Sequence, residues 1–268
     1  VRRALEAAIE QRRIDTELPV ENNAVIAGIG CSGNMVHLLE GNQPYGFHAI
    51  HGRTLPVAMG VKMARTDLNV VVVAGDGDFL SIGMEHIAPQ ASRNLNITAI
   101  IMDNAVYGLT KGQGSPTSQK GHVTSSTPYG NPVDGLNPLK LYLTLGISFI
   151  ASGLSSKVKD LSQLMLNAMN HQGFSVVHIQ SPCTTYHNTY EQLKGNLRKG
   201  IDPLAWPISD DHDSTDLKSA NEIVDASGIP LGVIYKDESR PTFDMAVDDI
   251  VSQSKKKSLE SIIDGYTI

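Results

Sequence analysis

The most constraining feature of this sequence is the run Asn-Val-Val-Val-Val-Ala at residues 69–74, which ends directly in Gly-Asp-Gly-Asp at residues 75–78. A strand made almost wholly of apolar residues has no face suited to water, so both of its faces must be covered. Such strands are typical of parallel sheets, whose crossover helices pack on either side. The run therefore predicts a central strand of an α/β sheet.

Apolar spacing continues this alternation along the first two thirds of the chain. It predicts helices at 2–12, 51–65, 81–93, 137–145 and 155–170, and strands at 24–27, 97–102, 147–151 and 175–180. Pro89 argues against a helix in the second half of 81–93. Residues 103–135 have no clear period, and a loop of this length inside a compact domain is usually functional. We expect an α/β fold with a mostly parallel sheet and helices on both faces.

The pattern weakens in the last third of the chain. Residues 184–228 are polar and irregular, residues 231–235 form one short strand candidate, and residues 254–268 are a charged tail. We therefore expect one domain over residues 1–190 and an irregular C-terminal extension over residues 191–268. This extension is expected to wrap the domain or to contact a partner.

Composition narrows the classes of function. The 268 residues are 41% hydrophobic and carry a net charge of −6, which argues against a nucleic-acid partner, because such partners select basic patches. No apolar stretch approaches the roughly 20 residues that a membrane span needs, and no signal peptide is evident. With only two cysteines, the chain does not resemble a secreted disulfide framework, so we expect a cytoplasmic, reducing location.

Two strand ends carry the candidate chemistry. Asp76 follows the valine run and Asn104 follows the strand at 97–102, and parallel strands joined by one crossover helix end at the same edge of a sheet. A diphosphate needs a hard cation, and Mg²⁺ prefers carboxylate, amide and carbonyl oxygens. Glycines beside Asp76 would let the backbone approach phosphates closely. The sequence therefore predicts a shared Mg²⁺–diphosphate site.

Several motifs occur in a specific order. They are Gly-Ile-Gly-Cys-Ser-Gly at 28–33, His-Ala-Ile-His-Gly-Arg at 48–53, Gly-Asp-Gly-Asp at 75–78, Met-Asp-Asn-Ala-Val-Tyr-Gly-Leu-Thr-Lys-Gly-Gln at 102–113, Ser-Pro-Thr-Ser at 115–118 and Gln-Ser-Pro-Cys at 180–183. Together they resemble the thiamine-diphosphate-binding β subunit of 2-oxoacid:ferredoxin oxidoreductases of the 2-oxoglutarate or pyruvate type. The resemblance covers roughly residues 1–190 and implies the thiamine-diphosphate-binding fold.

The resemblance also implies residue roles. Asp76, Asn104 and the carbonyl of Val106 would hold Mg²⁺, while Gly75, Gly77 and Asp78 would line the diphosphate. Cys31 and Ser32 would lie where cofactor and iron–sulfur cluster meet, and His51 would approach the reactive end of the cofactor. Leu109 and Lys111 would contact the substrate, with the Lys111 ammonium pairing with a substrate carboxylate.

The implied activity is oxidative decarboxylation of a 2-oxoacid to acyl-CoA and CO₂, with electrons passed through iron–sulfur centres to ferredoxin. The cofactors would be thiamine diphosphate, Mg²⁺ and a [4Fe–4S] cluster, and the partners an α subunit, ferredoxin, coenzyme A and the 2-oxoacid. In this family the glutamate that activates the cofactor belongs to the α subunit. We therefore expect a heterodimer and no activity from this chain alone. The preferred 2-oxoacid stays open.

The cysteines depart from the family pattern. A [4Fe–4S] cluster takes four cysteine thiolates, and Cys31 and Cys183 match the third and fourth. The first two belong to a Cys-x-x-Cys ahead of the opening helix, at which this sequence begins. N-terminal truncation is the preferred interpretation, and true loss of the cluster is the alternative. Asn34 also stands where some relatives have a basic residue.

Plainer interpretations remain open. Gly-Asp-Gly-Asp is also an ordinary turn sequence, and residues 28–33 match a dinucleotide fingerprint, although no acidic residue follows at the required strand end. His51 has the alternative of a helix N-terminal residue, Lys111 of a solvated lysine, and Cys31 and Cys183 of buried thiols. The alternative functions are a thiamine-diphosphate-dependent decarboxylase or synthase without electron transfer, and a non-catalytic cofactor-binding partner subunit.

Overall fold

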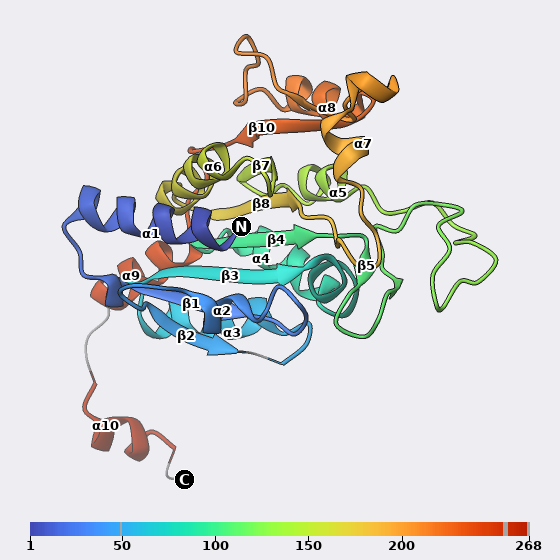
Figure 1. Ribbon diagram of the computed structural model, residues 1–268. Coiled ribbons are helices and arrows are strands. Elements are labelled where there is room, and N and C mark those ends of the chain that lie inside the picture. The colour runs from blue at the N-terminus through green and yellow to red at the C-terminus, as the bar shows by residue number, and fades with distance from the viewer. Residues whose placement is uncertain (49, 254–256, 267–268) are drawn as a thin grey trace.

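The computed structural model describes residues 1–48, 50–253 and 257–266. Its core is an eight-stranded sheet with the order β2-β1-β3-β4-β8-β7-β10-β9, in which only the pairing of β10 with β7 is antiparallel. The strands are β1 (Asn23–Ala27), β2 (Tyr45–His48), β3 (Asn69–Gly75), β4 (Ile97–Asp103), β7 (Phe149–Leu154), β8 (Phe174–Gln180), β9 (Ala205–Pro207) and β10 (Ile229–Lys236). The predicted mostly parallel sheet is confirmed (Figure 1).

Helices cover both faces of this sheet. The described helices are α1 (Arg2–Thr16), α2 (Met35–Leu38), α3 (Thr54–Ala64), α4 (Ile87–Arg93), α5 (Pro138–Thr144), α6 (Val158–Asn170), α7 (Tyr190–Lys194), α8 (Leu217–Asp225), α9 (Phe243–Gln253) and α10 (Leu259–Asp264), of which α10 lies apart from the sheet (Figure 1). Strand β3 shows why two layers form, since successive side chains point to opposite faces. Val71 and Val73 belong to an apolar cluster with residues of α1 and α6, whereas Val70 and Val72 belong to one with residues of α3, α4 and α5.

The region between β3 and β4 differs from the single helix predicted at 81–93. A π-helical turn (Asp78–Ile82) and a 3₁₀ turn (Met84–His86) come first, and α4 follows. Pro89 lies in the first turn of α4, where a proline removes no helical hydrogen bond. The second half of the predicted helix at 81–93 is therefore helical, although the proline argued against a helix there. These two turns connect the Gly75–Asp78 segment at the end of β3 with the start of α4.

The C-terminal third is more regular than the sequence indicated. Residues 184–228 contain α7, β9 and α8, and β10 extends the main sheet by pairing with β7. Strand β9 is a three-residue edge strand, too short to produce a period. Strand β2 also escaped prediction, because its residues are exposed and carry no buried pattern.

Candidate active site

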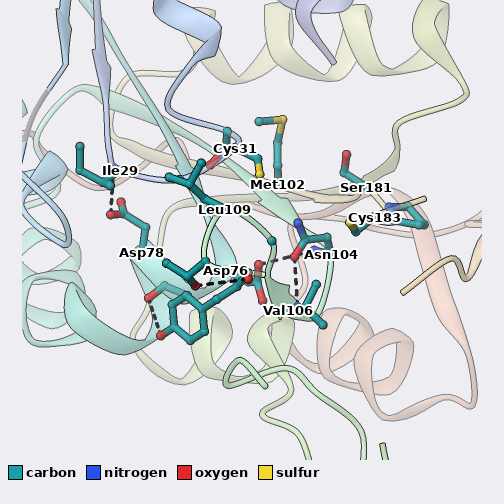
Figure 2. A pocket seen from close by; sticks show the side chains of 18 of the residues that line it. Ile29, Cys31, Asp76, Asp78, Met102, Asn104, Val106, Leu109, Ser181 and Cys183 are labelled. Carbon is teal, nitrogen blue, oxygen red and sulfur yellow. Dashed lines mark hydrogen bonds between the residues drawn. The ribbon is translucent and has the colours of Figure 1, made fainter. Parts of the chain in front are cut away.

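A cavity of about 380 Å³ opens at the carboxyl ends of β1, β3, β4 and β8. Its walls come from segments far apart in sequence, and Figure 2 shows their side chains converging. Every predicted site residue except Lys111 lines it, namely Cys31, Ser32, His51, Gly75, Asp76, Gly77, Asp78, Asn104, Val106, Leu109 and Cys183. The end of each parallel strand supplies one part of the wall, as the topology predicts.

Asp76 and Asn104 meet at the floor of this cavity. β3 pairs with β4 so that Gly75 lies opposite Met102, which brings the two following loops together. The backbone amide of Asn104 lies 3.5 Å from Oδ1 of Asp76 (Figure 2). The amide of Val106 donates to Oδ1 of Asn104 at 3.0 Å, so the turn at residues 104–106 carries an amide and a carbonyl oxygen beside the Asp76 carboxylate of the neighbouring loop.

The charge of Asp76 is poorly compensated. This residue is 2% exposed, and burial, followed by the nearby charge of Asp103, raises its pKa to about 7. The hydroxyls of Ser115 and Thr117 and the amide of Asn104 oppose this rise without cancelling it. A buried carboxylate in this state favours a bound cation.

A hydrogen-bonded network that sequence reasoning missed lies behind Asp76. Thr117 Oγ1 bridges Oδ2 of Asp76 at 3.0 Å and Oδ1 of Asp103 at 2.7 Å. Oδ2 of Asp103 lies 3.0 Å from Nε2 of His178, whose Nδ1 lies 3.2 Å from the Tyr142 hydroxyl. Burial tends to raise the pKa of Asp103, but the hydrogen bond and charge of His178, together with hydrogen bonds from Thr117 and Ala105, outweigh it and lower the pKa. Asp103 is therefore the ionised carboxylate of this pair.

Asp78 has a different environment from Asp76. Its Oδ1 accepts hydrogen bonds from the amides of Ile29 at 3.2 Å and Gly52 at 2.8 Å, and it pairs with Nδ1 of His51. Gly28 makes room for this carboxylate, since a Cβ there would stand 2.0 Å from Oδ2 of Asp78. Asp78 thus ties three loops of the cavity together, and His51 is more than a helix N-terminal residue.

Gly77 is required by packing against Tyr107. A Cβ on Gly77 would lie 2.2 Å from Cε1 of the Tyr107 ring, and the Tyr107 hydroxyl lies 3.4 Å from the Gly77 carbonyl. On the same rim, a Cβ on Gly75 would approach Oγ of Ser32 to 3.1 Å. The Gly-Asp-Gly segment therefore serves close packing as well as backbone exposure.

The two cysteines lie at the cavity's edge. Cys31 is exposed and Cys183 is partly exposed, so the alternative of two buried thiols was wrong. Partial desolvation, and then the proximity of Cys183, raises the pKa of the Cys31 thiol. The fold thus brings together two sulfur atoms whose residues are far apart in sequence.

Lys111 lies outside the cavity wall, two residues beyond Leu109, and is exposed. Its backbone is left-handed, with φ 79°, and the amide of the next residue, Gly112, donates to the Tyr107 carbonyl at 2.9 Å. A non-glycine residue held in this conformation costs free energy that the surroundings must supply. The loop therefore presents the Lys111 side chain from a fixed turn.

No group of three or more His, Cys, Asp or Glu side chains is placed to bind a metal in the described ranges. The expected Mg²⁺ ligands include one carboxylate only, so they do not form a group of that kind. Among the described helices, none is long and apolar enough to cross a bilayer.

Comparison with protein families gives two adjacent matches. Residues 28–179 match the family described as thiamine pyrophosphate enzyme, C-terminal TPP binding domain. Residues 183–251 match the family described as the C terminal of the pyruvate ferredoxin oxidoreductase beta subunit. The first match contains the Asp76 and Asn104 loops, which favours the diphosphate interpretation over an ordinary turn or a dinucleotide site.

Individual relatives agree with these matches. The chain is 38% identical over 238 residues to the β subunit of 2-oxoacid:ferredoxin oxidoreductase 2 from Aeropyrum pernix, a match that covers 86% of this chain and 76% of that one. It is 37% identical to the 2-oxoglutarate oxidoreductase subunit KorB of Mycobacterium tuberculosis, over 86% of this chain and 59% of that one.

A solved structure matches nearly the whole chain. It is 2-oxoglutarate:ferredoxin oxidoreductase from Magnetococcus marinus with 2-oxoglutarate, coenzyme A and succinyl-CoA bound. The TM-score is 0.86 at 36% identity, with 99% of this chain and 89% of that chain covered.

Proposed function

Because the chain belongs to the β subunits of 2-oxoacid:ferredoxin oxidoreductases, we propose that its cavity binds Mg²⁺ and thiamine diphosphate for oxidative decarboxylation of a 2-oxoacid. The observation that carries this proposal is the meeting of Asp76 and Asn104 at the ends of two adjacent parallel strands. That position is where open α/β sheets bind ligands.

The donor set fits Mg²⁺. Asp76, the side-chain oxygen of Asn104 and the carbonyl of Val106 are hard oxygen ligands, and all three residues line the same cavity. Burial, and then the nearby charge of Asp103, raises the pKa of Asp76, so a cation beside this carboxylate would favour its ionised form. Mg²⁺ would stabilise the ionised form of Asp76 and leave phosphate oxygens and water to complete its coordination.

The surrounding residues would shape the diphosphate end of the site. Gly75 and Gly77 would allow close backbone approach because they carry no side chain, and a Cβ on Gly77 would also overlap the Tyr107 ring. Asp78 would act by holding the loops of Ile29 and His51 in place, and His51 would face the cofactor's reactive end. Thiamine diphosphate supplies the electron sink that decarboxylation of a 2-oxoacid requires.

We propose that electrons leave the cavity at the edge where Cys31 and Cys183 lie. Cys31 and Cys183 would contribute two of the four thiolates of a [4Fe–4S] cluster, with the other two supplied by cysteines outside residues 1–268. Ferredoxin would then receive the electrons, and coenzyme A the acyl group. Leu109 and Lys111 would contact the 2-oxoacid, with Lys111 reaching a substrate carboxylate.

The proposal also requires a partner. The cavity is partly open, and we propose that an α subunit lies over it and supplies the acidic group that activates the cofactor. Residues 191–268 would serve as the partner-contacting extension, and they carry exposed apolar side chains such as Met245 (55%) and Ile250 (68%).

The test is activity of the assembled enzyme. The chain would be purified with its α-type partner, and CO₂ release and reduction of a redox dye would be measured with pyruvate and with 2-oxoglutarate. We expect both products with at least one 2-oxoacid, and neither from this chain alone. CO₂ release without dye reduction would favour a non-oxidative decarboxylase, and no reaction with either acid would contradict the proposal.

A further inference from the structure

A buried histidine lies behind the proposed metal site and contacts neither the cofactor cavity nor any proposed ligand. His178, on β8, is 1% exposed and lies between Asp103 and Tyr142. We propose that His178 is a positioning residue, which acts through Asp103 and Thr117 to fix the oxygens of Asp76, Asn104 and Val106 for the metal. The inference rests on the proposed Mg²⁺–thiamine diphosphate site.

The strand register creates this contact. β4 and β8 are parallel neighbours, with Ile101 opposite His178 and Asp103 opposite Gln180. The Asp103 side chain therefore extends along the same face as His178, two positions further on. Because an ionised carboxylate only accepts hydrogen bonds, Nε2 of His178 must donate the proton in their 3.0 Å contact.

The second carboxylate oxygen of Asp103 bonds the loop that carries the proposed metal ligands. Oδ1 of Asp103 accepts from the amide of Ala105 at 2.9 Å and from the hydroxyl of Thr117 at 2.7 Å. Ala105 has φ 58°, a strained conformation that turns the chain between Asn104 and Val106. The Asp103 carboxylate thus holds the turn that carries two of the three proposed ligands.

Thr117 connects the third ligand to the same carboxylate. Its hydroxyl touches Asp76 and Asp103 together. The neighbouring Ser118 hydroxyl donates to the Ala105 carbonyl at 2.6 Å. Residues 115–118, a motif with no separate role in the proposed site, therefore brace the ligand loop from the side away from the cofactor cavity.

Close packing does not hold this loop from behind. A second cavity of about 600 Å³ is lined by Asp103, Asn104, Ala105, Thr117 and His178. The ligand loop therefore separates two cavities, and its position depends on hydrogen bonds more than on packing. Removing His178 would leave the buried Asp103 carboxylate without this partner and lower stability, so metal affinity, compared with that of an equally buried control variant, tests the positioning role.

Paired variants of the complete complex test this role. His178→Leu removes the donor to Asp103, whereas His178→Gln retains an N–H at a comparable reach. Thr117→Val and Thr117→Ser form a second pair, without and with the hydroxyl. The control is His171→Leu, because His171 is also buried (3% exposed) but bonds Ser148 Oγ, away from the cavity.

The readouts are Mg²⁺ affinity by calorimetry with saturating thiamine diphosphate, and thermal stability without metal. Partners that orient metal ligands typically change affinity about 10–100-fold when removed, so we expect that weakening in His178→Leu and Thr117→Val. His178→Gln and Thr117→Ser should bind within a few fold of the unmodified complex, and His171→Leu should lower stability without changing affinity.

Two outcomes separate this inference from the proposed function. If the unmodified complex binds Mg²⁺ and Asp76→Asn does not, while His178→Leu and Thr117→Val bind normally, the positioning role is wrong and the metal site stands. If the unmodified complex shows no Mg²⁺-dependent binding of thiamine diphosphate, the proposed site fails and the inference fails with it.

Discussion

The sulfur atoms of Cys31 and Cys183 converge on Gly108. A Cβ on Gly108 would lie 3.3 Å from Sγ of Cys31 and 3.9 Å from Sγ of Cys183. Gly108 belongs to the same loop as Asn104 and Val106. Both thiols therefore lie beside the loop that carries two of the proposed metal ligands. This proximity suits a route for electrons between a cofactor in the cavity and a cluster at its edge.

Replacing either cysteine with serine should remove iron from the complete complex. Because thiolates hold iron–sulfur clusters, Cys31→Ser and Cys183→Ser should each lower iron content and the visible absorbance of anaerobically purified complex. Binding of thiamine diphosphate should persist in both. The control is Thr184→Ala, which alters the same rim without a sulfur atom. Full iron content in both cysteine variants would contradict the assignment.

Adding a methyl group at Gly77 should disturb the cavity. The new Cβ would overlap the Tyr107 ring at 2.2 Å, and overpacking of this kind destabilises proteins by about 1–3 kcal/mol. We therefore expect Gly77→Ala to lower the denaturation midpoint and to weaken thiamine diphosphate binding. Gly60→Ala is the matched control, because nothing lies within 4 Å of a Cβ there. In helix α3 that change should instead stabilise by about 0.5–1 kcal/mol. Equal effects at the two sites would refute the steric argument.

Mg²⁺ binding should depend on pH near neutrality. Burial, and then Asp103, raises the pKa of Asp76 from 3.8 to about 7. Between pH 3.8 and about 7, Asp76 of the folded protein without Mg²⁺ stays protonated, whereas the same side chain in the unfolded chain has lost its proton. Its stability should therefore fall as pH rises from about 4 to 7. Mg²⁺ needs the ionised carboxylate, so its affinity should drop up to about tenfold per pH unit below 7.

Calorimetry in buffers of different ionisation enthalpy measures this linkage. At pH 6 binding of Mg²⁺ should release close to one proton, and at pH 8 almost none. Proton release that is equal at both pH values would show that Asp76 does not titrate in this range.

We expect the Lys111 side chain to favour 2-oxoglutarate over pyruvate as the substrate. A hydrogen bond from an ammonium to a carboxylate contributes about 1.5–3 kcal/mol, equivalent to roughly 10–100-fold. We expect Lys111→Met to raise KM for 2-oxoglutarate by about tenfold or more, with little change for pyruvate, which has no second carboxylate. Lys120→Met is the control, since Lys120 is an exposed lysine of the same long loop but lines only the second cavity. Parallel changes for both acids would argue against this role.

Much of the fold followed from residues with a strong local signal. The valine run of β3 is buried on both faces, and such a strand leaves a continuous apolar pattern. The meeting of Asp76 and Asn104 followed from the order of motifs along parallel strands. Strand β2 could not be predicted, because it is an exposed edge strand whose sequence carries no burial pattern.

The network behind the site could not be read from the sequence. His178 and Asp103 meet only through the register of β4 and β8, and register across a crossover is set by tertiary packing. Thr117 lies in a loop without a period, so its contact with both carboxylates was invisible. The motif at 115–118 was recognised in the sequence, but its contacts with Asp76, Asp103 and Ala105 could not be predicted from it.

The central claim is that a divalent cation at Asp76 and Asn104 holds thiamine diphosphate in the cavity. The most direct measurement is calorimetric titration of thiamine diphosphate, with and without Mg²⁺, into the complete complex and into its Asp76→Asn variant. The account predicts tight, Mg²⁺-dependent binding to the unmodified complex and loss of that dependence in the variant, with thermal stability preserved. Unchanged Mg²⁺-dependent affinity in Asp76→Asn would contradict it.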